Sequence, residues 1–162
     1  MLLFHTTRYV LLIIVGLAIV SVVEAKTVCD LHLSRIENMP FTGERSQDSH
    51  YDAIKNAGKS AVPCLIANVT NRRYAPDPRP IPRWGTIRTT VGHRAVYMLW
   101  DMTNVDPIKM LPRRYQRLHK QIGVYALDEY LLDARANPRA LQRKLWRWYR
   151  TTYLPYMEGD AT

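Results

Sequence analysis

The chain has 162 residues, with 23 lysines and arginines against 14 aspartates and glutamates, and a formal net charge of +9 at pH 7. This length suffices for one domain with a real core and is short for two. The low glycine content and the lack of a repeated low-complexity tract argue for a globular chain. Its excess of positive charge favours anionic partners.

Residues 1–25 have the features of a signal peptide. Arg8 supplies a positively charged start, and an almost uninterrupted apolar run follows from residue 9 to residue 23. Val23 and Ala25 fit the small-residue positions of a cleavage site, so we expect a mature chain of residues 26–162 in the periplasm or outside the cell. An uncleaved inner-membrane anchor is the alternative, but the apolar run is shorter than the roughly 20 residues of a spanning helix.

The mature chain keeps both cysteines, Cys29 and Cys64. An exported protein that carries two thiols into an oxidising compartment usually pairs them. We therefore predict a disulfide between Cys29 and Cys64. A reactive thiol at Cys64 is the alternative, but no neighbouring residue in the sequence resembles a base.

Two short helices are expected on either side of Gly58. Asp48 or Ser49 can cap the first helix, and Gly58 suits its C-terminal turn. Ser60 is expected to cap the second helix, with Pro63 in its first turn. Together these helices would form an antiparallel hairpin.

The segment from Ala53 to Ile66 reads AIKNAGKSAVPCLI. It resembles one HEAT-type repeat, in which a glycine turn is followed by Ala-Val-Pro-x-Leu-Ile. A solenoid needs at least three such units, and no second copy is visible, so the resemblance implies a lone hairpin within a compact helical domain.

The tripeptide Gly58-Lys59-Ser60 also matches the end of a phosphate-binding loop signature. However, the first glycine of that signature is replaced by Ala53, and no strand precedes it. Nucleotide binding is therefore not expected.

Residues 70–92 have the composition of a long loop, with prolines at every second position from 76 to 82 and arginines at positions 72, 73, 79, 83 and 88. Prolines at this density exclude a helix and hold an extended path. Ordered loops of more than about 15 residues are often functional. Arginine and tryptophan dominate protein interfaces, so Arg79, Arg83 and Trp84 are the candidate partner-binding residues. A stiff surface connection is the alternative.

Three further helices are expected from apolar residues at helical spacing. The first spans about Gly92 to Met102, and the second runs from about Gln116 to Leu131 despite Gly123. The last begins after an Asn-Pro pair at 137 and 138, which suits an N-cap followed by the first helical position. The predicted fold class is all-α: a compact single helical domain with one HEAT-like hairpin and a long Pro/Arg-rich loop.

The last helix separates apolar from cationic side chains. Leu141, Leu145, Trp148 and Tyr149 fall on one arc. The opposite side carries Arg139, Arg143, Lys144, Arg147 and Arg150. The simplest interpretation is a stripe that faces the core and a solvated basic face. An anion-attracting or membrane-surface helix is the functional alternative.

No catalytic motif is recognised in the sequence. The mature histidines, at positions 32, 50, 93 and 119, are scattered, and none belongs to a spaced metal motif. The closest pairing is His50 with Asp52, which do not share one face of a helix. We therefore expect no cofactor, no metal and no enzymatic activity, although distant residues can still converge in a fold.

In its small size, export and helical content, the chain resembles the periplasmic immunity proteins of type VI secretion amidases. That resemblance implies an inhibitor that binds an exported hydrolase, such as an amidase-type effector, and it assigns no binding residue. The alternative is an envelope-associated protein whose basic faces bind anionic lipid or cell-wall polymer. Arginines interleaved with aromatic residues also suit nucleic acid, but export argues against that partner.

Overall fold

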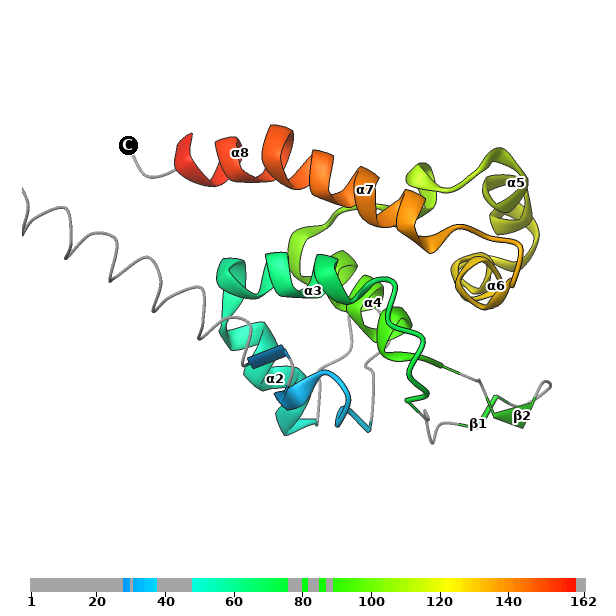
Figure 1. Ribbon diagram of the computed structural model, residues 1–162, viewed down its shortest axis with the longest axis horizontal. Coiled ribbons are helices and arrows are strands. Elements are labelled where there is room, and N and C mark those ends of the chain that lie inside the picture. The colour runs from blue at the N-terminus through cyan, green and yellow to red at the C-terminus, as the bar shows by residue number, and fades with distance from the viewer. Residues whose placement is uncertain are drawn as a thin grey trace, which may run out of the picture.

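The computed structural model describes residues 28–29, 31–37, 48–75, 80–81, 85–86 and 89–159. The predicted signal peptide, residues 1–25, lies outside the described residues. The described chain is mostly helical, which confirms the predicted all-α class, and adds one short pair of antiparallel strands (Figure 1). The helices share a single hydrophobic core.

The first predicted helix is α2, Ser49–Asn56, and Asp48 is its N-cap as the sequence indicated. The predicted cap of the second helix is wrong. Ser60 lies in a 3-10 turn, Gly58–Ala61 (η1), and its Oγ donates to the Ala57 carbonyl at 2.7 Å. Because this turn continues directly into α3, Val62–Asn68, its own carbonyls receive the first amides of α3 and no side-chain cap is needed.

Asp48 ties the N-terminal segment to α2. Its carboxylate accepts from the backbone N–H of Glu37 at 2.7 Å, and from those of His50 and Tyr51 at 2.9 and 3.0 Å. The substitution Asp48→Ala should therefore lower the free energy of unfolding by about 2 kcal/mol, measured by urea denaturation. Asp48→Asn is the control, since it keeps an oxygen for the α2 amides and should lose less. Equal stability of the alanine variant and the native chain would contradict this role.

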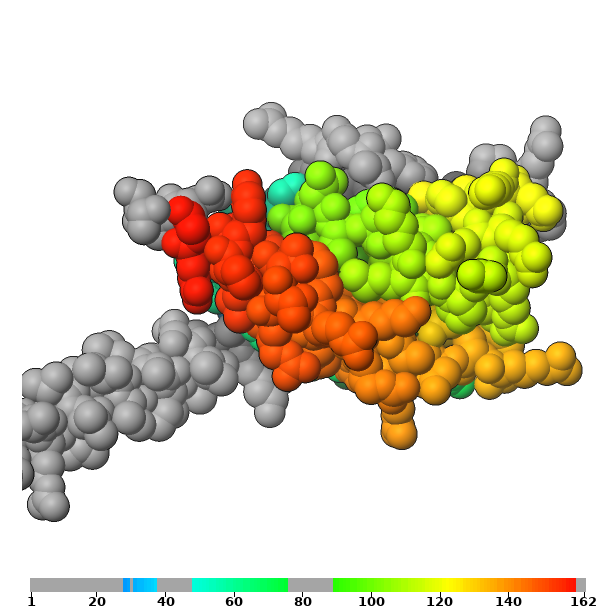
Figure 2. Space-filling model, turned by 90° about the horizontal axis from the view of Figure 1, so that it is seen from above, coloured from blue at the N-terminus to red at the C-terminus, as the bar shows by residue number. Residues whose placement is uncertain are grey.

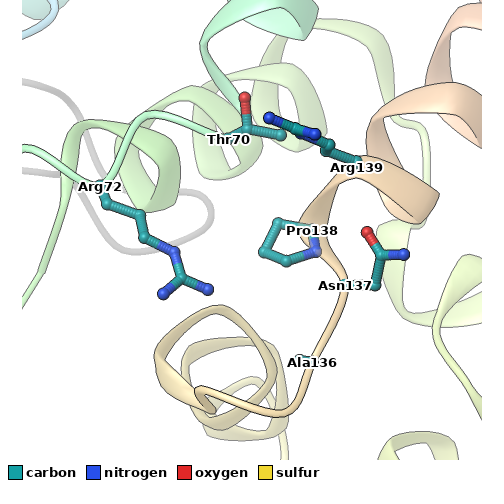
Figure 3. A pocket seen from close by; sticks show the side chains of 6 residues that line it. All are labelled: Thr70, Arg72, Ala136, Asn137, Pro138 and Arg139. Carbon is teal, nitrogen blue, oxygen red and sulfur yellow. The ribbon is translucent and has the colours of Figure 1, made fainter.

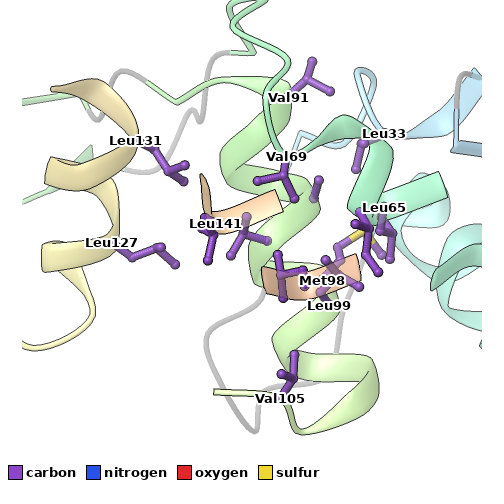
Figure 4. Close-up of a cluster of buried hydrophobic side chains, with 14 of the residues drawn as sticks. Leu33, Leu65, Val69, Val91, Met98, Leu99, Val105, Leu127, Leu131 and Leu141 are labelled. Atoms are coloured by element: carbon purple, nitrogen blue, oxygen red, sulfur yellow. The ribbon is translucent and has the colours of Figure 1, made fainter. Parts of the chain in front are cut away.

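The central helix is α4, Val91–Thr103. Its first half is buried on all sides, and Ala95, Val96, Met98 and Leu99 have no exposed surface. α3 packs along it, and α6 approaches it from another side. Figure 4 shows the leucines of α6 and α7 pointing toward α4. Because α4 is enclosed in this way, α3 and α6 are positioned by packing against it.

The sequence predicted one helix from Gln116 to Leu131, and this is wrong. α5, Arg113–Ile122, ends at Gly123, and α6, Tyr125–Leu132, starts two residues later. Gly123 has a φ of 63°, a left-handed conformation that ends a helix. The two helices fold back on each other as a hairpin. Before α5, a 3-10 turn, Pro107–Met110 (η2), leads out of α4.

α7, Pro138–Trp148, begins as predicted, because the Asn137 side chain accepts from the N–H of Ala140 at 3.2 Å and Pro138 follows it. The helix continues through a wider π turn, Tyr149–Tyr153 (η3), into α8, Leu154–Gly159. In Figure 1 these three pieces form one long rod along the molecule, with α8 at the end remote from α5 and α6.

Cys29 and Cys64 lie at disulfide-bonding distance, with their Cα atoms 6.1 Å apart. The pair joins the N-terminal segment to α3. Leu33 and Ile36 of the same segment are buried beside it in the hydrophobic core. The N-terminal segment is thus held by a few apolar side chains, by Asp48, by this pair, and by the buried Arg94, whose guanidinium donates to the Leu33 and Ser34 carbonyls.

Candidate functional site

The Pro/Arg-rich loop leaves the helical body as a hairpin. At its base Ala75 N–H donates to the Thr89 carbonyl at 3.0 Å, and Val91 N–H donates to the Arg73 carbonyl at 3.0 Å. The Thr89 hydroxyl also donates to the Ala75 carbonyl. Farther out, β1, Pro80–Ile81, pairs antiparallel with β2, Gly85–Thr86. We call residues 73–91 the hairpin arm; its strand pair lies apart from the helices in Figure 1.

The start of α4 is joined to the base of the arm. Thr90 Oγ1 accepts from the N–H of His93 at 3.4 Å, and Thr90 N–H donates to His93 Nδ1 at 3.1 Å. His93 is 1% exposed, and its Nε2 lies 3.9 Å from Asp128 Oδ1 of α6. Burial lowers the pKa of His93 to about 4, so the ring is neutral at pH 7. A neutral buried histidine here positions the arm, because its Nδ1 must accept from Thr90.

Gly92 allows the chain to pass close to α3 at the base of the arm. Its N–H donates to the Asn71 carbonyl at 2.9 Å, and a Cβ at this position would lie 2.6 Å from the Val69 carbonyl oxygen. Because those atoms belong to the backbone, Gly92→Ala should lower the free energy of unfolding by about 2 kcal/mol.

Thermal or urea denaturation checks the prediction for Gly92, and Gly159→Ala in α8 is the matched control. A Cβ at Gly159 meets nothing within 4 Å, so this substitution should leave stability unchanged or raise it slightly. Similar stability of the two alanine variants would contradict the close approach at Gly92.

The sequence-predicted contact residues Arg79, Arg83 and Trp84 lie outside the described residues. Of the other cationic and aromatic side chains of this region, Arg73 and Tyr74 at the base of the arm are exposed, and Tyr74 is 60% exposed. The described part of the arm thus exposes an arginine and an aromatic side chain, which are the residue types of the three predicted contact residues.

A hollow of about 340 Å³ lies where α7 starts (Figure 3). Its lining comprises Thr70, Arg72, Ala136, Asn137, Pro138 and Arg139. Figure 3 shows Arg72 and Arg139 on different sides of the Pro138 ring, with Arg139 beside Thr70. Neither guanidinium forms an ion pair or hydrogen bond within the described part of the chain. Two cations from distant parts of the sequence therefore face one opening, which suits an anionic group.

Four arginines follow one line on the rod that starts at this hollow. Arg139, Arg143, Arg147 and Arg150 are spaced by four, four and three residues, and all four are exposed. We call this row the cationic ridge. It lies on the rod that Figure 2 shows as an orange-to-red band across the molecule. As the sequence predicted, the opposite side of α7 faces the core through Leu141 and Leu145.

Comparisons with known protein families, curated proteins and solved structures gave no match. None of the described helices has the length and apolar composition needed to cross a membrane.

One pairing of titratable groups was missed by the sequence interpretation. His50 meets His32, with their Nδ1 atoms 2.9 Å apart. The two histidines are 18 positions apart, and no spacing rule brings them together. Within the described residues no group of three or more His, Cys, Asp or Glu side chains is placed to hold a metal ion.

Proposed function

We propose that this protein acts by binding another exported protein through the hairpin arm, without chemistry of its own. The supporting observation is the form of the arm: its two ends are held together by backbone hydrogen bonds, while its strand pair lies away from the helical body. Such a base restricts the conformations of the arm before binding. Less ordering entropy is then lost when a partner binds.

The residue types of the arm support a protein partner. Arg79, Arg83 and Trp84 are of the kinds that contribute most to protein interfaces, and the prolines stiffen the chain that carries them. The resemblance to amidase-immunity proteins, which rests on size, export and helical content, favours an exported hydrolase as that partner. In this proposal the protein is an inhibitor that covers a surface of the hydrolase.

The test is affinity capture by the immobilised mature chain, residues 26–162, from the envelope fraction of its own cells. The triple variant Arg79→Ala, Arg83→Ala, Trp84→Ala should bind a captured partner about 100-fold more weakly or worse, because hot-spot side chains each contribute about 2 kcal/mol or more. Adding the native chain should also reduce the hydrolase activity of that partner.

The matched control removes the same kinds of side chain elsewhere. Arg113, Arg117 and Tyr125, on α5 and α6, are exposed, and their triple alanine variant should retain the partner. Melting temperatures establish that both variants are folded. A folded arm variant that binds the partner as tightly as the native chain would refute the proposal.

A further inference from the structure

The last part of the chain carries a large excess of positive charge. Residues 134–157 contain six lysines or arginines and no aspartate or glutamate. One of them, Lys144, donates to the Met110 carbonyl at 2.6 Å. The four guanidinium groups of the cationic ridge form no ion pair or hydrogen bond in the part of the chain that the structure describes.

The stability of the fold does not require this row of arginines. Like charges four residues apart on a helix repel each other and destabilise it. Elsewhere in the described chain some exposed cations pair with acids, as in Lys55 with Asp101 at 2.8 Å and Arg114 with Asp133 at 2.7 Å, and the row of four on the rod is longer than the unpaired set on α5. The core contact of α7 uses its other side, so the ridge arginines are not needed for packing. A row of unpaired cations retained against its own repulsion indicates a ligand of negative charge.

The shape of the ridge identifies the class of ligand. Its arginines lie along about 16 Å of one helix, in a row that a flat surface can contact at every turn. Guanidinium groups bind phosphate oxygens through two parallel hydrogen bonds. Protein hot spots also use arginine, but they place it together with tryptophan or tyrosine anchors at the centre of the interface. Among the described residues of α7, no large apolar side chain is exposed that could serve as one.

We propose that the cationic ridge binds the surface of a membrane that contains anionic phospholipid. The phosphates of neighbouring headgroups would contact successive ridge arginines, and Arg72 would join Arg139 on a headgroup at the hollow where the ridge begins. This surface is separate from the hairpin arm, so the proposal stands whether or not the arm binds a protein.

Vesicle co-sedimentation of the mature chain tests the proposal. Vesicles of phosphatidylglycerol mixed with phosphatidylethanolamine should bind the protein, and vesicles of phosphatidylcholine alone should not. Each cation near an anionic bilayer strengthens partitioning about fivefold, so Arg143→Gln, Arg147→Gln, Arg150→Gln together should weaken it roughly 100-fold. Binding of the native chain should disappear near 1 M salt, where the Debye length is about 3 Å.

The matched control removes three charges from another exposed cationic helix, α5. Arg113→Gln, Arg117→Gln, Lys120→Gln changes the net charge equally and should weaken binding less than about fivefold. Far-ultraviolet circular dichroism should be unchanged and the melting temperature should not fall in either triple variant, because every substituted side chain is exposed. Arg143→Glu with Arg147→Glu is a second ridge variant, since the new carboxylates pair with Arg139 and Arg150 along the helix and should abolish vesicle binding.

Three results would each overturn the proposal. Equal weakening by the two triple variants would show that net charge alone attracts the protein. Vesicle binding that survives both ridge variants would exclude the ridge. Binding of soluble polyphosphate without binding of phosphatidylglycerol vesicles would assign the ridge to an anionic polymer instead of a lipid surface.

Discussion

The free energy of unfolding of the double variant Cys29→Ala, Cys64→Ala should be about 4 kcal/mol lower than that of the disulfide-bonded protein. The two cysteines are separated by 35 positions, and a bond between them removes conformational entropy from the unfolded chain. The other contacts of the N-terminal segment include Leu33 and Ile36 in the core, the Asp48 cap, and the buried Arg94, which donates to the Leu33 and Ser34 carbonyls. Urea denaturation near pH 7, followed by circular dichroism, measures the difference.

Reduction of the native chain separates the bond from the side chains. Cys29 and Cys64 are 1% and 9% exposed, so alanine at both positions also removes some packing. A reductant should therefore reproduce most of the loss in the native chain and have no effect on the double variant. If oxidised and reduced protein unfold at the same urea concentration, the cross-link does not stabilise the fold.

Sequence predicted those elements whose signals are local. Asp48 and Asn137 stand before helical residues whose free amides need an acceptor, and both are N-caps in the structure. The two errors arose where backbone geometry overrode a residue preference. A 3-10 turn leads into α3, so Ser60 does not cap that helix. The left-handed conformation of Gly123 ends α5, so the single helix that apolar spacing indicated is two helices.

The surfaces depend on contacts between distant segments and were less predictable. The solvated face of α7 followed from its helical spacing, but the hollow needs Arg72 and Arg139 at one opening, which no local rule provides. Gln142 shows the same limit, because its amide donates to the carbonyls of Ile66 and Ala67 at 3.0 and 2.9 Å and thereby holds α7 against α3. The HEAT-type and immunity-protein resemblances stay predictions.

Acidification should destabilise the protein through His93. Burial lowers the pKa of this residue to about 4, and an interaction with the Asp128 backbone opposes the shift only in part. In the unfolded chain the pKa returns to about 6.5. Between these two values the unfolded chain binds a proton at His93 that the folded chain does not. The contribution of His93 is therefore fully present above pH 6.5, falls as the pH falls, and reaches a loss of about 3 kcal/mol near pH 4.

Urea denaturation at a series of pH values measures this slope in the native chain and in His93→Asn. Asparagine keeps an acceptor for the Thr90 N–H but does not titrate, so the variant should lose much of the pH dependence between 4 and 6.5 whatever its stability at pH 7. Proton NMR gives an independent reading, because the His93 ring in the folded chain should stay neutral down to about pH 5. An unchanged slope in the variant, or a His93 ring that titrates near pH 6.5, would show that the ring is reached by water and that its neutral form does not hold the base of the hairpin arm.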